Sequence, residues 1–280
     1  MSHGDAPQQQ QQHPRTVVVT GGALGIGGGI SRRFAADGDH VVLVDIDADA
    51  AARTAADIEA DGGRCSVLVG DITADDTVAR LAAQVESEHG HADVLVNNVG
   101  DFRPAKSFFA KSPPEQWRRL HELNLWHVFA VTHQLLPGMI AAGGGSIINV
   151  STVEAFRGIP GNAVYSAYNA GVSAFTKSLA VELGPSGIRV NAIAPDLADT
   201  PQTPADLMLA GRDPALLRSW LPAGRFGRPE DFAGVVAFLA SRDAAFVTGH
   251  TIPVDGGTLA ASGWYAKASG RGWTNMPDQA

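Results

Sequence analysis

The chain has 280 residues, of which 45% are hydrophobic and 18% charged, and this balance predicts one α/β domain with a large buried core. A net charge of −8 without a long basic run argues against nucleic acid and anionic membranes as partners. The single cysteine excludes an intrachain disulfide and a cysteine-rich metal site, and no apolar run approaches the roughly 18 residues of a membrane span. We therefore expect a soluble, cytoplasmic protein without a bound metal.

The first 14 residues include five consecutive glutamines, a composition that predicts a disordered leader. After them, strand-like and helix-like patterns alternate along the chain. Strands are expected at 17–19, 40–45, 65–69, 93–97, 145–150, 188–194 and 251–254. Helices are expected at 25–37, 48–61, 74–88, 113–142, 164–184 and 229–240, with a broken helical stretch at 203–220.

Such alternation requires right-handed crossovers and helices on both faces of a parallel sheet. The sequence therefore predicts the α/β class, with a doubly wound, seven-stranded parallel sheet in a single-domain Rossmann fold. This domain is expected to span residues 15–257, and residues 258–280 form a carboxyl-terminal tail.

The stretch TVVVTGGALGIGGGI at 16–30 combines an apolar β-branched run, a glycine-rich turn and the start of a helix. This is the first half of a dinucleotide-binding βαβ unit, in which glycines let backbone N–H groups approach a pyrophosphate at a helix N-terminus. The next strand ends in Asp45, 18 residues after Gly27. A carboxylate there can accept both ribose hydroxyls of NAD and repels the 2′-phosphate of NADP, so we expect NAD as the cofactor.

In sheets of this kind the ligand binds outside the carboxyl ends of the strands, which makes the segments after the strands the functional candidates. These segments are 20–27, 45–47, 70–72, 97–102, 151–163 and 195–222. Within the last of them, Pro201–Pro222 is rich in proline, methionine and leucine. Its length and apolar character predict a substrate lid.

Several motifs follow one another in a characteristic order: Thr20-Gly21-x3-Gly25-Ile26-Gly27, Asn97-Asn98-Val99-Gly100, Asn124, Tyr165, Gly227-Arg228-Pro229-Glu230-Asp231 and Val254-Asp255-Gly256-Gly257. Together they resemble the classical short-chain dehydrogenase/reductase family over about residues 14–258. The resemblance implies an oxidoreductase that interconverts a secondary alcohol and a ketone by hydride transfer. It also implies a homotetramer.

The cofactor-binding residues implied by this resemblance are Gly21, Leu24, Gly25, Ile26, Gly27, Asp45, Asp71, Ile72, Asn98, Gly100, Tyr165, Asn169, Pro195 and Thr200. Asp71 and Ile72 would flank the adenine, and Thr200 would hold the nicotinamide carboxamide. Asp71 has an equally good explanation as an N-cap of the helix that follows it.

The catalytic residues implied by the resemblance are Tyr165 as the acid/base, Thr152 to polarise the reacting oxygen, and Asn124 and Asn169 to orient water and ribose. Where the family has a lysine four residues after the tyrosine, this chain has Asn169. An amide donates hydrogen bonds but supplies no charge to lower the tyrosine pKa. A catalytically silent NAD-binding oligomer is therefore the rival interpretation.

Two further features each have two interpretations. Asp196 stands where the family has a glycine, and its carboxylate either favours the cationic oxidised nicotinamide or turns outward. The aromatic residues Trp264, Tyr265 and Trp273 of the tail either cover a partner subunit or roof the substrate cleft. The apolar lid points to a hydrophobic or alicyclic substrate.

Overall fold

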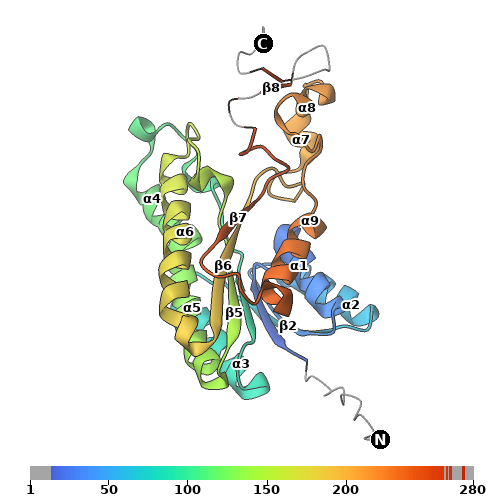
Figure 1. The fold of residues 1–280 in the computed structure, drawn as a ribbon, viewed down its shortest axis with the longest axis vertical. Coiled ribbons are helices and arrows are strands. Elements are labelled where there is room, and N and C mark those ends of the chain that lie inside the picture. The colour runs from blue at the N-terminus through green and yellow to red at the C-terminus, as the bar shows by residue number, and fades with distance from the viewer. Residues whose placement is uncertain (1–13, 262, 264, 267–272, 275–280) are drawn as a thin grey trace, which may run out of the picture.

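The computed structural model describes residues 14–261, 263, 265–266 and 273–274 (Figure 1). A seven-stranded parallel sheet forms its centre, with the strand order β3-β2-β1-β4-β5-β6-β7. Its strands are β1 (Thr16–Thr20), β2 (His40–Asp45), β3 (Arg64–Val69), β4 (Val94–Asn97), β5 (Gly145–Val150), β6 (Ile188–Pro195) and β7 (Thr251–Val254). The chain order reverses direction at β1, which places the topological switch point between β1 and β4.

The helices are α1 (Gly25–Ala36), α2 (Ala48–Ala60), α3 (Asp75–His89), α4 (Pro114–His121), α5 (His127–Ala142), α6 (Ala163–Leu183), α7 (Ala205–Leu209), α8 (Leu217–Trp220) and α9 (Pro229–Ala240). One hydrophobic cluster joins the sheet to α1, α2 and α9, and a second joins it to α3, α5 and α6. Figure 1 shows these two groups of helices on opposite faces of the sheet. The predicted doubly wound Rossmann fold is confirmed.

The central strands are nearly continuous apolar runs because both of their faces are covered. All five residues of β1 are buried, and in β2 only the two terminal residues are partly exposed. Among the described residues, no helix combines the length and the apolar character that crossing a bilayer requires.

The single long helix predicted at 113–142 is divided in the structure. Its middle, Glu122–Trp126, is π-helical and separates α4 from α5. A π-segment is one wide turn inserted in an α-helix, often at a functional site, and it changes the phase of the side chains on either side. Hydrophobic periodicity alone does not locate such an insertion. The buried Asn124 lies within it.

A ladder of buried amides and hydroxyls crosses the sheet from β4 to α6. The Asn97 amide nitrogen donates to Asn149 Oδ1 at 2.9 Å and to Thr132 Oγ1 at 3.1 Å. The Asn149 amide in turn donates to Thr176 Oγ1 at 3.0 Å. All four side chains are buried, so each hydrogen bond satisfies a group that water does not reach.

The segment predicted as a lid contains α7 and α8, and its Leu217 and Leu221 form a small apolar cluster with Phe226, which follows the segment. Beyond β7, the tail forms a short antiparallel pair, β8 (Tyr265–Ala266) with β9 (Trp273–Thr274), and β8 contacts α8. Figure 1 shows this pair beside the lid helices. The predicted leader, apart from its last residue, and Trp264 of the tail lie outside the described residues.

Candidate functional site

A cleft of about 590 Å³ opens along the carboxyl ends of the strands. Most of the residues predicted for the site line it: Gly21, Leu24, Gly25, Ile26, Asp45, Asn98, Gly100, Asn124, Thr152, Tyr165, Asn169, Pro195 and Thr200. They come from the turn between β1 and α1, from the ends of β2 and β6, from the loops after β4, β5 and β6, from the π-helical segment and from α6. The fold therefore gathers segments that are far apart in the chain into one continuous wall.

The glycine turn between β1 and α1 has the shape of an anion cradle. Gly21 and Gly25 adopt positive φ angles of 62° and 54°, a conformation that other residues rarely adopt. A side chain at position 27 would overlap the carbonyl oxygen of Gly21, so the helix begins directly against the turn. The N-cap residue, Leu24, makes no side-chain cap, which leaves the first N–H groups of α1 available to a phosphate.

Asp45 occupies the edge of this cradle at the end of β2. Its Oδ2 accepts a hydrogen bond from the Ala23 amide at 3.0 Å, and its Oδ1 accepts one from the Asp47 amide at 3.0 Å. Two backbone donors thus fix the carboxylate on the cleft wall. Its remaining lone pairs are available to donors such as ribose hydroxyls.

Three of the predicted cofactor residues do not line the cleft. Gly27 serves the packing of α1 against the turn, and Ile72 is buried. Asp71 accepts hydrogen bonds from the Thr73 amide and hydroxyl and pairs with Arg119 at 3.5 Å. Burial opposes its ionisation, but these hydrogen bonds and the Arg119 charge lower the pKa of Asp71 below its ordinary value. Asp71 therefore closes the turn before α3, but the N-cap interpretation is wrong, because the N-cap of α3 is Ala74.

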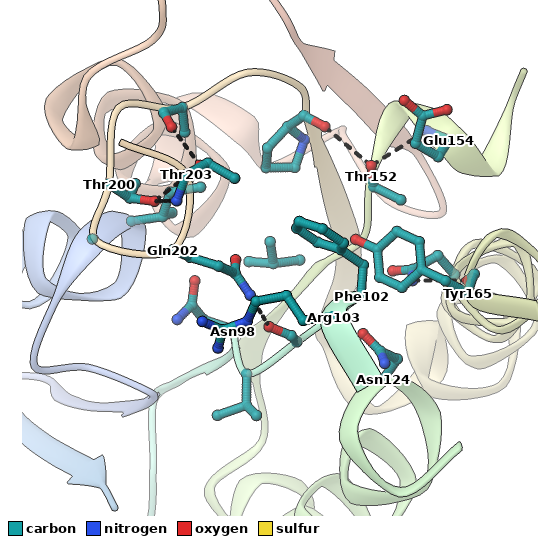
Figure 2. A pocket seen from close by; sticks show the side chains of 18 of the residues that line it. Asn98, Phe102, Arg103, Asn124, Thr152, Glu154, Tyr165, Thr200, Gln202 and Thr203 are labelled. Atoms are coloured by element: carbon teal, nitrogen blue, oxygen red, sulfur yellow. Dashed lines mark hydrogen bonds between the residues drawn. The ribbon is translucent and has the colours of Figure 1, made fainter. Parts of the chain in front are cut away.

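One side chain bridges the cleft from the lid to the loop after β4. The Gln202 amide nitrogen donates to the carbonyl oxygen of Gly100 at 3.2 Å, and Figure 2 shows this contact reaching across the opening. Next to it, the Thr200 and Thr203 hydroxyls lie 3.2 Å apart. Gln202 falls in the segment 195–222 that was expected to be functional, but it was not itself a predicted site residue.

Tyr165 lies in the first turn of α6 with its phenol oxygen pointing into the cleft (Figure 2). Tyr165 is partly exposed, and the Phe102 ring meets it edge-on at 6.1 Å between centroids. Burial raises the pKa of Tyr165 to about 12, a rise that a hydrogen bond with Thr152 opposes and the carboxylates of Glu154 and Asp101 reinforce. The phenol is therefore neutral at physiological pH and is a potential proton donor.

Two asparagines near Tyr165 use their amides within the protein. Asn169 is buried, lines the cleft and donates to the carbonyl oxygen of Tyr165 at 3.1 Å. Asn124 accepts from the Asp101 amide at 3.0 Å and donates to the Asp101 carbonyl at 2.9 Å. Through these two hydrogen bonds, Asn124 holds the loop after β4 against the π-helical segment.

Asp196 does not present a free carboxylate to the cleft. Its Oδ2 lies 2.9 Å from Arg157 Nη2 and also accepts a hydrogen bond from the Thr258 hydroxyl. The expectation of an outward-turned charge is therefore wrong, because the side chain is paired and nearly buried. The same pairing offsets the charge that the other interpretation of Asp196 requires.

Comparison with known proteins identifies the family of this fold and cleft. The family model described as "Enoyl-(Acyl carrier protein) reductase" matches residues 21–258. The chain belongs to the short-chain dehydrogenase/reductase family. The members of this family are oxidoreductases that bind a nicotinamide cofactor, so the resemblance inferred from the motifs is confirmed at the level of the family.

Two curated members of the short-chain dehydrogenase/reductase family illustrate the similarity. Cis-4-hydroxycyclohexanecarboxylate dehydrogenase of Sinomonas cyclohexanicum is 41% identical over 251 residues, with 88% of this chain and 97% of that protein covered. The 3-oxoacyl-[acyl-carrier-protein] reductase FabG of Thermotoga maritima is 39% identical over 245 residues, with 88% and 98% covered. Among solved structures, a variant of actinorhodin polyketide ketoreductase with NADPH superposes with a TM-score of 0.81 at 32% identity, with 88% and 97% covered.

Several residues that shape the cleft of this short-chain dehydrogenase/reductase were not predicted. Phe102, Lys106, Ile159 and Met208 line its substrate end, and Arg157 lies behind it. The available sequence signal was their place after strands: the predicted segments 97–102, 151–163 and 195–222 contain Phe102, Ile159, Met208 and Arg157. Lys106 lies just beyond the predicted segment 97–102. Their individual roles depend on side-chain contacts between segments, which a sequence pattern does not specify.

Proposed function

We propose that this protein is an NAD-dependent oxidoreductase that interconverts a secondary alcohol and a ketone, with Tyr165 as the proton-transferring residue. The observation that carries the proposal is the Tyr165 phenol oxygen pointing into the cleft beside the Thr152 hydroxyl. The cleft meets the needs of the cofactor, because its glycine cradle is free of side chains where a pyrophosphate would bind. When bound, the nicotinamide gives or takes the hydride.

The work of the protein's own residues is proton transfer and orientation. In the direction of reduction, neutral Tyr165 donates its phenolic proton to the substrate oxygen, and in oxidation its ionised form accepts the proton of the alcohol. Thr152 Oγ1 lies 3.4 Å from the Pro195 carbonyl and 3.3 Å from the Glu154 amide, which fixes its orientation. To act on the reacting oxygen, Thr152 would turn its hydroxyl hydrogen from the Pro195 carbonyl to that oxygen while it still accepts from the Glu154 amide.

The proposed preference for NAD rests on Asp45. Its carboxylate is held on the cleft wall by two amides and would accept the ribose hydroxyls, whereas a 2′-phosphate would meet a like charge. Leu24 agrees with this assignment because it brings no cation to the cradle. The solved structure of the ketoreductase relative contains NADPH, so the proposed preference for NAD would distinguish this chain from that relative.

The proposed active site is atypical at position 169. Asn169 supplies no charge beside Tyr165, and its amide already donates to the Tyr165 carbonyl. A nearby cation would lower the tyrosine pKa by roughly 1–3 units, so its absence limits the ionised fraction at neutral pH. In this proposal the Oδ1 oxygen and the second amide hydrogen of Asn169 orient water or ribose together with Asn124.

The proposed substrate is a hydrophobic or alicyclic alcohol or ketone. Phe102, Ile159, Leu197 and Met208 form an apolar wall at the substrate end of the cleft. The cyclohexane-ring substrate named for the Sinomonas relative is consistent with such a wall. A homotetrameric assembly remains a prediction from the family resemblance, and a cytoplasmic location remains a prediction from the composition.

The deciding experiment follows NADH formation with a panel of cyclic and steroid-like alcohols, from about pH 7 to about pH 10, for wild type, Tyr165→Phe and Asn169→Lys. We expect turnover that rises with pH in wild type and is lost in Tyr165→Phe. Tight NAD binding without turnover in any variant would instead support a catalytically silent NAD-binding oligomer.

A further inference from the structure

A single nitrogen of Arg157 contacts two carboxylates at the substrate end of the cleft. Its Nη2 lies 3.0 Å from Glu154 Oε1 and 2.9 Å from Asp196 Oδ2. The side chains of Glu154, Asp196 and Arg157 are 12%, 9% and 26% exposed, respectively. Thr258 completes the group by donating its hydroxyl hydrogen to Asp196. We call Glu154, Arg157, Asp196 and Thr258 the clasp.

The clasp ties together three loops that are distant in sequence. Glu154 and Arg157 follow β5, Asp196 follows β6, and Thr258 follows β7. The Thr258 amide donates to the Asp255 carbonyl oxygen at 3.4 Å, and Asp255 Oδ2 accepts a hydrogen bond from the Leu259 amide at 2.8 Å. Arg157 thus joins the loops after β5 and β6, and the hydrogen bond from Thr258 to Asp196 adds the loop after β7.

Thr152 lies inside the ring that the clasp closes. Its Oγ1 accepts from the Glu154 amide at 3.3 Å and lies 3.4 Å from the carbonyl oxygen of Pro195, the residue before Asp196. One path from Thr152 leads through Glu154 to Arg157, and the other leads through Pro195 and Asp196 to the same arginine. Separation of the two loops would therefore move both partners that orient the Thr152 hydroxyl.

Arg157 is the only cation of the clasp and neutralises both of its carboxylates. Without the guanidinium, Glu154 and Asp196 would be two nearly buried carboxylates that repel each other and lack a counter-charge. Breaking such a group by removing one partner is strongly destabilising locally, because uncompensated charge remains. We expect the loops after β5 and β6 to move apart to hydrate it.

We propose that Arg157 is a positioning residue: through the clasp it holds the loops after β5, β6 and β7 together and fixes the Thr152 hydroxyl opposite Tyr165. The proposal rests on the proposed function, in which Thr152 acts on the substrate oxygen. It gives Asp196 a new role: its ion pair with Arg157 fixes the position of the neighbouring Pro195 carbonyl, which Thr152 contacts.

A double-mutant cycle tests the clasp, using Arg157→Ala, Asp196→Asn and the combined variant. We expect Arg157→Ala to lower kcat by about tenfold or more, while the Kd for NADH, followed by its fluorescence, changes less than about twofold. In the Asp196→Asn background, Arg157→Ala should lower kcat by less than about threefold, because one of the two repelling charges is gone. A loss of packing alone would give additive effects.

Rescue by lysine provides a second readout. Because one nitrogen makes both contacts, the compact ammonium of Arg157→Lys can bridge the same two carboxylates, so we expect it to restore most of kcat. The matched control is Arg33→Ala, which removes the arginine of an exposed ion pair with Asp37 on α1 and should leave kcat unchanged.

Additive effects in the cycle, or an Arg157→Lys variant no better than Arg157→Ala, would overturn the proposal. The free energy of unfolding, measured for the same variants without substrate, separates this failure from failure of the proposed function. If wild type turns over no alcohol but the unfolding cycle shows coupling between positions 157 and 196, the clasp stands and the enzymatic proposal falls. An absence of coupling in both measurements overturns the clasp itself.

Discussion

The two halves of the cleft are built by different means. The cofactor half, around the loops after β1 and β2, consists of backbone: positive φ angles at Gly21 and Gly25, free N–H groups at the start of α1, and one carboxylate held by amides. The substrate half, around the loops after β4 to β7, consists of side chains that meet from distant segments. A backbone cradle is encoded by glycine spacing, whereas a side-chain constellation is specified only by the complete fold.

The largest expected effect is a loss of kcat on changing Tyr165 in the substrate half, with cofactor binding in the other half retained. Tyr165→Phe removes the phenolic proton from the substrate half, so we expect kcat to fall by about 10²-fold to 10⁴-fold. The Kd for NAD should stay within about twofold, since the cradle is untouched. Steady-state kinetics and cofactor fluorescence measure the two quantities. Tyr168→Phe, on the same helix but not on the cleft wall, is the control, and an equal loss in that variant would contradict the assignment.

The next effect concerns the pH dependence of oxidation. With a pKa of about 12, Tyr165 is ionised in only about one molecule in 100,000 at pH 7, and this fraction rises about tenfold per pH unit. Asn169→Lys places an ammonium four residues away, which lowers the pKa and should raise oxidation at pH 7 by about tenfold or more. The pH–rate profile measures the shift. Asn169→Gln keeps the amide and should leave the profile in place. An unchanged pH–rate profile in Asn169→Lys would show that an ammonium at position 169 does not lower the pKa of Tyr165.

A smaller effect is expected when the cradle is crowded. Gly27→Ala forces a methyl group against the Gly21 carbonyl, so we expect the free energy of unfolding to fall by about 1–3 kcal/mol and NAD binding to weaken. Gly184→Ala is the matched control, because a Cβ there meets no atom within 4 Å. Chemical denaturation of both variants measures the difference. Equal stabilities would show that the turn accommodates a side chain.

The smallest effect tests the selection between cofactors. Asp45→Ala removes the charge that a 2′-phosphate would meet, and we expect the ratio of NAD to NADP affinity to fall by about tenfold. Asp47→Ala removes a neighbouring carboxylate that caps α2 and is not on the cleft wall, so it should cost some stability and leave the ratio unchanged. An unchanged ratio in Asp45→Ala would place the selection elsewhere.

The same contrast explains how much could be predicted from the sequence. The strand patterns, the glycine turn and the position of Asp45 were correctly located, because each depends on local backbone geometry or a short period. Tyr165 and Thr152 were placed on the cleft wall through family motifs. The predicted long helix at 113–142 was interrupted, because a π-turn leaves no compositional signature.

The contacts of the substrate half could not be predicted in the same way. Arg157 lies 39 residues from Asp196, and Gln202 lies 102 residues from Gly100. Each pairing depends on the direction in which two loops leave the sheet. Asn124 and Asn169 were expected to orient water and ribose, yet both amides first satisfy backbone groups around them. A motif identifies which residues converge but not which hydrogen bonds they form.

The amide ladder between Asn97 and Asn149 has a consequence for how the chain reaches its native state. These residues face each other directly in the pairing of β4 with β5. A slip of one residue between the two strands would leave both amides without partners inside the protein, at a cost of about 1–3 kcal/mol for each unsatisfied group. The ladder therefore favours the native register of β4 and β5 over a register shifted by one residue.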